Sequence, residues 1–466
     1  MTSDYTLFVS YLRHVIYKEF FLERGFSVMT KQEIKQAVLA AIDAGREEIF
    51  AVKDSIYQNP EFGYKEVKTT ATVADFLESL GLKVERNIAV TGCRARANEG
   101  KSGPHIAVMG ELDGISCKEH KDANEIGASH TCGHNLQVAG MIGAALGLVR
   151  SGVLDQLDGQ VSFIGVPAEE FIELEYREQL KKEGKICYFG GKQELIRRGE
   201  LDDVDMAMMF HAQDTGDMKA IIGPESNGFI GKKIHFIGKE SHAGSAPYEG
   251  INALNAAMLA INNVHALRET FRESERARFH PIITKGGDIV NVVPADVTME
   301  AYVRARTIQG LSDINSRINQ AILAGGMAVG ANVEITEIPG YLPILKQPEM
   351  DGILRENLKE LGLEGAIIEG SDFTGSFDFG DISHLMPAIH PMFGGVRGAL
   401  HTRDFELVDP DLACIVPAKA MAMTIIDLLF DGAKEAKDIL ANFKPVMTKE
   451  EYLAYQQNND RTITLR

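Results

Sequence analysis

Three apolar segments in the first half of the chain end in side chains that carry charge or bind metals. "HIAVMGELD" ends at Asp113, "GQVSFIGVPAEE" ends at Glu169 and Glu170, and "VDMAMMFHA" has His211 near its close. Such apolar runs are typical of buried strands, and helical segments separate them. Strands alternating with helices predict an α/β fold with a mostly parallel sheet, whose sites lie at the carboxyl ends of its strands. We therefore expect these side chains to meet at one edge of a sheet.

The middle of the chain has a different pattern. Residues 224–337 are expected to run strand, helix, two strands, helix, strand, with "GINALNAAMLAINNVHALRETF" as the first helix. This order predicts a compact α+β, ferredoxin-like domain inserted into the first one. The α/β pattern resumes afterwards, so residues 29–223 and 338–466 are expected to form the larger domain. Two domains also suit 466 residues, which are too many for one core.

The first 28 residues are interpreted as an N-terminal extension. They are rich in apolar residues, but Arg13, His14, Lys18 and Glu19 interrupt any signal-peptide core. Met29 directly precedes "TKQEIKQAVLAAID", a sequence typical of a capped helix start. We expect Met29 to be the functional start, and the alternative is a genuine extra helix.

Charge and cysteine content exclude some partners. The net charge of -18 argues against nucleic acid and an anionic membrane surface, which both attract clustered Lys and Arg. We expect no run to approach the roughly 20 apolar residues that span a bilayer. Five scattered cysteines suit a reducing cytoplasm rather than a disulfide framework.

"SHTCGHN", residues 129–135, is the first candidate for a chemical site. Cys132 and His134 are two residues apart, and on a regular helix such side chains diverge. They can converge where a loop enters a helix, and Gly133 permits that backbone. A metal site is one interpretation and a buried cysteine in a histidine-containing loop is another. A Cys nucleophile with His134 as its base fits this spacing poorly.

The "PAEE" motif favours a cation. Glu169 and Glu170 follow an apolar strand, and burying two neighbouring carboxylates is costly unless a cation compensates them. Adjacent side chains point apart, so the two carboxylates would have different roles. A solvated acidic loop is the alternative. His211 and His401, each alone, would more often be structural histidines, but with Cys132, His134 and Glu170 they form a possible ligand set.

Several motifs occur together in a specific order: "NPEFGYKE", "HTCGHN", "PAEE", "GGKQELIRRGELDDVDMAMMFHA", "SHAGSAPYEGINALNAA", "GGDIVNVVPADVTMEAYVR" and "LHTRDF". This set resembles the two-metal aminoacylase/carboxypeptidase metallopeptidase family, peptidase family M20. More narrowly, it resembles the branch with hippurate, indole-acetyl-amino-acid and aminobenzoyl-glutamate hydrolases. The resemblance covers residues 57–409, about three-quarters of the chain.

The resemblance implies a role for each matching residue. The implied metal ligands, for two divalent ions (Zn, Mn or Co), are Cys132, His134, Glu170, His211 and His401. Glu169 corresponds to the general base, and Asp113 is retained from a catalytic motif. His242 corresponds to a lid histidine that stabilises the tetrahedral intermediate across a dimer. Asn291 and Arg304 match positions that hold the substrate carboxylate. A homodimer formed through the lid is implied as well.

Some positions depart from the family pattern. Asn135 and Gln137 stand where relatives usually have Asp and His, and residues 171–188 form a longer link, expected to be a rim element. The expected function is a metal-dependent amidohydrolase that cleaves an N-acyl amino acid or short peptide with a free carboxylate. The alternatives are a general dipeptidase or exopeptidase and a catalytically silent binding homologue. The substrate pocket is the least transferable part.

Overall fold

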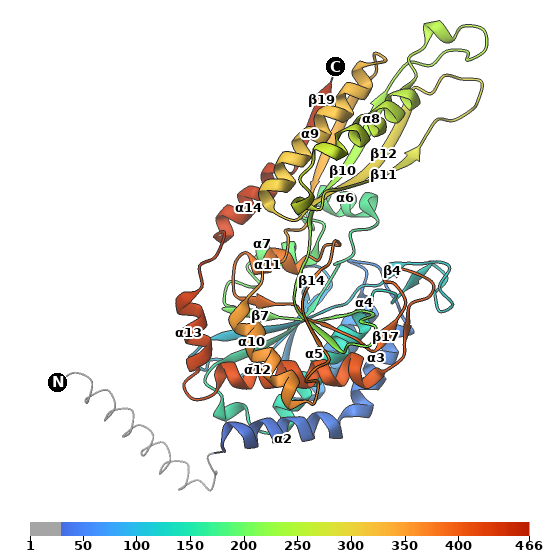
Figure 1. Cartoon of the computed structure of the whole chain (residues 1–466). Coiled ribbons are helices and arrows are strands. Elements are labelled where there is room, and N and C mark those ends of the chain that lie inside the picture. The colour runs from blue at the N-terminus through green and yellow to red at the C-terminus, as the bar shows by residue number, and fades with distance from the viewer. Residues whose placement is uncertain (1–28, 466) are drawn as a thin grey trace, which may run out of the picture.

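The structure is a computed structural model that describes residues 29–465. A larger domain forms the base, and an elongated lid domain projects from it (Figure 1). The expectation for residues 1–28 falls outside the described residues.

The larger domain is built on a six-stranded sheet. Its strand order is β1-β2-β6-β3-β7-β15, in which β6, β3, β7 and β15 are parallel and β1 and β2 are antiparallel. The strands are β1 (Lys83–Ile88), β2 (Gly92–Ala97), β3 (His105–Glu111), β6 (Gln160–Val166), β7 (Met206–Met208) and β15 (Ala388–Ile389). The predicted α/β fold with a parallel-containing sheet is confirmed.

Helices cover this sheet, and α5 is the most buried of the long ones. They are α2 (Lys31–Ala44), α3 (Arg46–Tyr57), α4 (Val67–Ser79), α5 (His134–Arg150), α7 (Gly191–Arg198), α10 (Pro348–Glu360), α11 (Phe379–Ser383), α12 (Val416–Leu429) and α13 (Lys434–Asn442). Helix α5 packs against α2, α3 and α12. Its glycines permit close approach, since a Cβ on Gly147 would lie 2.5 Å from Ile42. Gly45 separates α2 from α3, and a Cβ at this position would meet Leu146 at 2.5 Å.

One helical segment is more apolar than expected from the sequence, where no run was expected to be long enough to span a bilayer. The segment Asp411–Leu429 is long and apolar enough, by length and composition alone, to cross a membrane. It is also 89% buried inside the protein, where α12 packs between α5 and α10. Its apolar character is therefore explained by the core of the larger domain.

A second, four-stranded sheet lies beside the first and extends the region that carries the site. Its order is β14-β9-β16-β8, formed by β14 (Ile367–Asp372), β9 (Ala220–Glu225), β16 (Met392–Phe393) and β8 (His211–Ala212). The run "VDMAMMFHA", expected to be one strand, is divided between β7 and β8 in different sheets. Two short antiparallel pairs complete the domain: β4 (Ile115–Ser116) with β5 (Ala128–Ser129), and β17 (Val396–Arg397) with β18 (Glu406–Leu407).

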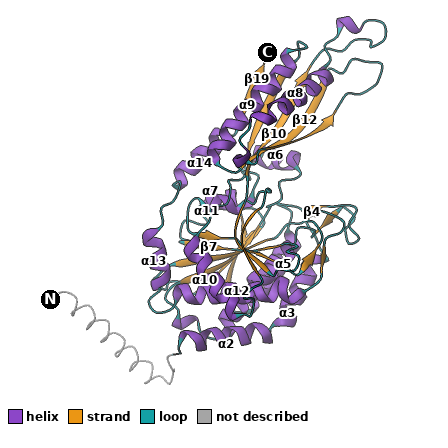
Figure 2. Ribbon diagram, in the orientation of Figure 1, coloured by secondary structure: helices purple, strands orange, loops and turns teal. Residues whose placement is uncertain are grey.

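The lid has the expected element order and one unexpected strand. In chain order it contains β10 (Gly228–Ile237), α8 (Ala253–Leu267), β11 (Arg278–Lys285), β12 (Asp296–Ala305), α9 (Ile308–Met327) and β13 (Asn332–Pro339). Figure 2 shows both helices on one face of the antiparallel sheet, where they contact β10 and β12.

The fifth strand of the lid sheet comes from the end of the chain. We expected residues 338–466 to belong wholly to the larger domain, but β19 (Arg461–Leu465) pairs with β13 in the order β11-β12-β10-β13-β19. Helices α13 and α14 (Lys449–Asn458) carry the chain along the side of the molecule to the lid (Figure 1). The outer edge of β13 would otherwise present unpaired backbone groups, which β19 satisfies.

Candidate metal centre and substrate cavity

The candidate ligands come from loops and element ends at one side of the larger domain. Cys132 lies in the loop between β5 and α5, and His134 is the first residue of α5. Gly133 between them has φ 81°, a left-handed conformation that glycine adopts without strain. Glu170 follows β6, and His211 begins β8. Strand ends and a helix start thus deliver these side chains to one place.

The five candidate ligands form two groups that share Cys132. One group is Cys132, His134 and His211, and the other is Cys132, Glu170 and His401, with ligand atoms within 4.8 Å of one another in each. Cys132 Sγ lies 3.4 Å from His211 Nε2 and 3.2 Å from His401 Nε2. Two ligand atoms bound to one ion at 2.0–2.3 Å are separated by about 3.0–3.5 Å at ordinary coordination angles. The observed separations therefore fit side chains arranged around divalent cations.

The imidazole tautomers support the same conclusion. His134 Nδ1 lies 2.8 Å from the Asp113 carbonyl, and His211 Nδ1 lies 2.7 Å from the Ala212 carbonyl. A carbonyl only accepts hydrogen bonds, so each neutral ring carries its proton on Nδ1 and presents a lone pair on Nε2. His134 Nε2 and Glu170 Oε1 are buried without a hydrogen-bond partner among residues 29–465. Their nearest polar neighbours are other possible ligand atoms, Glu111 Oε2 at 3.1 Å from His134 Nε2 and His401 Nε2 at 3.2 Å from Glu170 Oε1, and this crowding of ligand atoms fits a bound metal ion.

Burial and mutual charge shift the acidity of these groups. Burial and the nearby Glu170 oppose ionisation of Cys132, but three imidazoles outweigh them and lower the pKa of the thiol to about 6. Burial would raise the pKa of Glu170, but the His401 ring beside it lowers this pKa to about 2. Burial and neighbouring carboxylates, Glu111 first among them, raise the pKa of Glu169 well above its usual value. The adjacent glutamates therefore have opposite tendencies, one ionised and one able to carry a proton.

Asp113 is buried beneath the ligands rather than in the cavity. Its carbonyl and Oδ1 face His134 Nδ1 at 2.8 and 3.2 Å, and its Oδ2 accepts a hydrogen bond from the Glu170 backbone N–H at 2.9 Å. Asp113 therefore orients two ligands at once. We expected it in the catalytic group, and these contacts make it a positioning residue instead.

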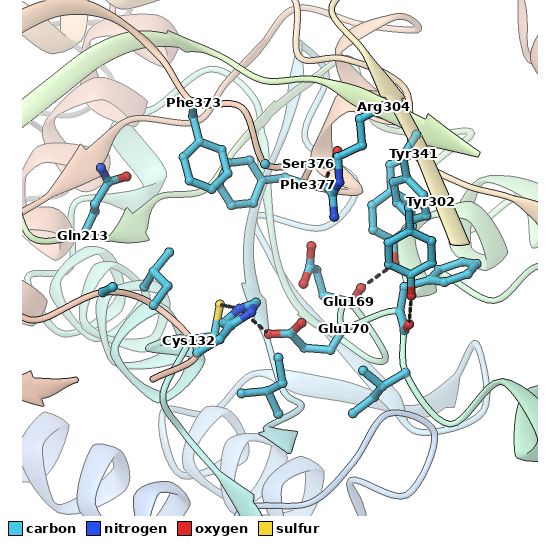
Figure 3. A pocket seen from close by; sticks show the side chains of 18 of the residues that line it. Cys132, Glu169, Glu170, Gln213, Tyr302, Arg304, Tyr341, Phe373, Ser376 and Phe377 are labelled. Atoms are coloured by element: carbon cyan, nitrogen blue, oxygen red, sulfur yellow. Dashed lines mark hydrogen bonds and ion pairs between the residues drawn. The ribbon is translucent and has the colours of Figure 1, made fainter. Parts of the chain in front are cut away.

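A cavity of about 820 Å³ opens beside the ligands, and the lid contributes to its wall. Glu169, Glu170 and His401 line it from the larger domain, and Arg304 and Tyr302 line it from the lid. Arg304 Nη1 donates a hydrogen bond to Ser376 Oγ at 2.7 Å, which links the two domains (Figure 3). Burial lowers the pKa of Arg304. A half-buried guanidinium at the cavity wall suits a carboxylate ligand.

The other two lid residues of the expected site lie elsewhere. His242 and Asn291 are both exposed, and neither is part of the cavity lining. They are neighbours, because the Ala243 N–H donates to the Asn291 carbonyl at 2.9 Å. His242 Nδ1 accepts from the N–H groups of Gly244 and Ser245, both at 3.1 Å, so the neutral ring presents Nε2–H to solvent. Within one chain, Arg304 reaches the cavity and this pair does not.

Comparisons with known proteins agree with this geometry. Residues 225–326 match the family model of the M20 peptidase dimerisation domain. The chain is 28% identical to the Xaa-Arg dipeptidase of Mus musculus over 456 residues, covering 92% of this chain and 97% of that protein. It is 29% identical to one chain of the p-aminobenzoyl-glutamate hydrolase of Escherichia coli over 308 residues, covering 64% of this chain and 59% of that one.

A solved structure has the same fold. A dinuclear metal-binding peptidase of the M20 family from Bacillus subtilis superposes with a TM-score of 0.62 at 20% identity, covering 83% of this chain and 99% of that one. The lid match, the relative aligned along almost its whole length and the donor set agree. Together they support an M20 family amidohydrolase. The protein is a metal-dependent hydrolase of amide bonds.

The enzyme also has a buried charge network that was not predicted from its sequence. Lys192 Nζ lies 2.6 Å from Glu111 Oε1 and also pairs with Asp378, and all three side chains are fully buried. Glu111 Oε2 in turn lies 3.1 Å from His134 Nε2. Burial would raise the pKa of Glu111, but Lys192 and His134 lower it below its usual value.

The long link after Glu170 has two parts in this enzyme. Phe171 and Ile172 line the cavity, as expected of a rim element. Helix α6 (Leu174–Lys182) instead lies under the lid sheet, where Glu178 pairs with Lys233 at 3.3 Å (Figure 1). Arg177 donates a hydrogen bond to the Phe189 carbonyl at 2.7 Å and another to the Glu170 carbonyl. The link therefore connects the lid surface to the backbone of a candidate ligand.

Proposed function

We propose that this enzyme hydrolyses the amide bond of an N-acyl amino acid or short peptide that has a free carboxylate. Two divalent ions (Zn, Mn or Co) would be held by Cys132 with His134 and His211, and by Cys132 with Glu170 and His401. The observation that carries the proposal is the pair of ligand groups sharing Cys132, facing a cavity that also contains Arg304. Ions bound there supply Lewis-acid polarisation of the amide carbonyl and make a water more acidic.

Side chains of the enzyme would transfer the protons and bind the substrate. Glu169 would take the proton of the attacking water and deliver it to the leaving amine as the C–N bond breaks. The raised pKa of Glu169 supports this role, since the group must hold the proton between the two transfers. Arg304 would bind the free carboxylate of the amino acid half and so orient the amide toward the ligands.

The lid supports a homodimer in this proposal. Eight of the twelve exposed large apolar side chains in the described chain lie between residues 224 and 337, among them Tyr248 at 82%, Ile282 at 63% and Val290 at 100% exposure. Several of them lie on or near β11, an edge strand whose outer backbone groups are open. A second copy would cover this surface. His242 of one subunit would then donate to the oxyanion in the other, with Asn291 beside it at the carboxylate.

A general dipeptidase remains the second candidate, because the mouse relative aligned over most of this chain carries a dipeptidase name. It differs from the first candidate only in the acyl half of the substrate. For the compartment we propose the cytoplasm, supported by five free cysteines.

The experiment uses the adjacent glutamates as a matched pair. Glu169→Gln should retain bound metal and lower kcat by about 10²–10⁴-fold, the contribution of a general base. Glu170→Gln should lose metal affinity. Metal content by elemental analysis and hydrolysis of a panel of N-acyl amino acids and dipeptides are the two readouts. Unchanged activity after chelation, or an active Glu169→Gln enzyme, would contradict the proposal.

A further inference from the structure

The lid is joined to the larger domain by two neighbouring crossings of the chain. The chain enters the lid before β10 and leaves it after β13, and the crossings lie side by side, because the Phe229 N–H donates to the Tyr341 carbonyl at 2.8 Å. Two such crossings form a hinge, about which a lid rotates through changes at a few backbone positions. The ion pair of Lys233 with Glu178 between the domains is partly exposed and resists such a rotation weakly.

The end of the chain makes a third connection between the domains. We name residues 443–465 the C-terminal strap. It leaves the larger domain after α13, continues as α14 along the side of the molecule and ends as β19 in the lid (Figure 1). Strand β19 lies at the opposite edge of the lid sheet from β11. The strap therefore ties one edge of the lid and leaves free the edge proposed for the dimer.

Helix α14 is anchored to the larger domain and to the hinge. The side chain of Tyr452 is fully buried, and its hydroxyl donates to Asp381 Oδ1 on α11 at 2.7 Å. Gln456 Nε2 donates to the same oxygen at 2.9 Å and to the Gly340 carbonyl at 3.3 Å. Gly340 precedes Tyr341 at the hinge, so one side chain of the strap contacts both the larger domain and the chain that leaves the lid.

Strand β19 is anchored in the lid. It pairs with β13 along its whole length, and Arg461 Nε lies 2.6 Å from Glu337 Oε2, whose buried carboxylate also pairs with Lys232 at 2.8 Å. Asn459 and Asp460 are the two residues between α14 and β19, and two extended residues reach ~7 Å. The tied edge of the lid therefore moves far from α14 only if β19 unpairs or α14 leaves its site.

We infer that the C-terminal strap is a tether that limits rotation of the lid and so holds Arg304 at the cavity wall. Arg304 lies on β12, in the same sheet as β19, and its hydrogen bond to Ser376 depends on the orientation of that sheet. Rotation of the sheet would carry the guanidinium away from the candidate ligands. The restraint on the lid stands independently of the substrate, whereas its effect on substrate binding rests on the proposed function.

The first measurement needs no substrate and uses two variants. One lacks residues 461–466, and the other has four extra Gly and Ser residues between Asn459 and Asp460, which add about 13 Å of reach and keep both anchors. Hydrogen–deuterium exchange of the metal-loaded proteins, read by mass spectrometry on peptides that contain Phe229 and Tyr341, should be severalfold faster in both variants. The matched control has the same insertion between Glu99 and Gly100, in an exposed turn of the larger domain, and should exchange as the wild type does.

The second measurement compares an N-acyl amino acid with its carboxamide analogue. Lengthening the tether should raise KM for the free carboxylate about tenfold, the contribution of a charge-assisted hydrogen bond. KM for the carboxamide and the metal content should stay close to the wild-type values. In an Arg304→Lys background the insertion should add little further to KM, because both changes remove the same interaction.

Hinge exchange as slow in the lengthened variant as in the wild type would overturn the inference. A rise in KM that is equal on both substrates and additive with Arg304→Lys would also overturn it, because that result indicates a general loss of structure. If the shortened chain fails to fold, the lengthened variant decides, since it keeps every contact of the strap. Faster hinge exchange in the variants, together with no hydrolysis of either substrate by the wild type, would support the tether and count against the proposed function.

Discussion

In the larger domain, the five candidate ligands come from four separated segments and meet within a few ångströms, whereas in the lid His242 and Asn291 lie together on an exposed surface. Four of the five candidate ligands are buried, and other groups orient them: Asp113 holds His134, and Arg177 contacts the Glu170 carbonyl. The ring of His242 accepts hydrogen bonds from two N–H groups of its own loop. Of the three expected lid residues, Arg304 lines the cavity, where it donates a hydrogen bond to Ser376 of the larger domain.

This difference indicates two ways of building a site. A buried centre is determined by the packing of one chain, because every polar group in it needs a partner or an ion. His242 instead lies on the surface, next to exposed apolar side chains. In the proposed dimer it would reach a substrate only when a second subunit packs against this surface. Metal binding by the larger domain is therefore expected to persist if the proposed dimer is disrupted. Stabilisation of the oxyanion by His242 is expected to be lost.

The largest expected effect lies in the larger domain. Lys192→Met would leave Glu111 and Asp378 buried without their cation, and breaking a buried ion pair costs about 3–5 kcal/mol. The free energy of unfolding, from urea denaturation of the metal-loaded protein, should fall by that amount. The matched control is Lys359→Met, whose exposed pair with Glu356 should contribute less than about 0.5 kcal/mol.

A second variant sharpens this test. Neutralising the partners as well, in Lys192→Met with Glu111→Gln and Asp378→Asn, should recover part of the lost stability, because no uncompensated charge remains. An equal free energy of unfolding for Lys192→Met and the wild type would show that the buried charge network does not stabilise the larger domain.

The next effect tests the lid. His242→Ala should lower kcat by about 10²–10³-fold, as for the loss of one oxyanion donor, and should leave metal content unchanged. Co-expression with Glu169→Ala would form mixed dimers in which one site has both Glu169 and the partner's His242. Random pairing should then restore about a quarter of wild-type activity, as a two-fold symmetric interface requires.

Two outcomes would contradict the separation between metal binding in the larger domain and oxyanion stabilisation by the lid histidine. Verified mixed dimers without recovered activity would show that His242 acts within its own chain or has no catalytic role. Loss of metal from His242→Ala would show that the lid histidine supports the metal centre itself.

The smallest effect concerns the one lid residue that reaches the cavity. Arg304→Lys replaces a bidentate fork with a point charge, so KM for a substrate with a free carboxylate should rise roughly tenfold with little change in kcat. The carboxamide analogue of the same substrate should be hydrolysed equally by both enzymes. An equal loss on both substrates would indicate that Arg304 shapes the cavity rather than binding the carboxylate.

The candidate ligands that the structure brings together could be named from the sequence, through their side-chain chemistry and the family resemblance. The ligand types are chemically distinctive, and they follow apolar strands or a glycine turn, which are local features. Glu111 and Lys192 were missed because nothing in the sequence indicates that a lysine at the start of α7 faces a carboxylate at the end of β3. The role of Asp113 depended in the same way on two hydrogen bonds to residues far along the chain.

The sequence by itself determined the α/β character, the inserted lid and the set of residues able to bind metal, because strand and helix periodicity and donor chemistry are local properties. The tertiary structure decided the rest. It paired β19 with β13 although more than a hundred residues separate them, divided one expected strand between two sheets and placed His242 on the surface. It also decided which acceptors remain unpaired in the cavity. Pairing partners and burial depend on contacts between distant segments, and such contacts exist only once the chain has folded.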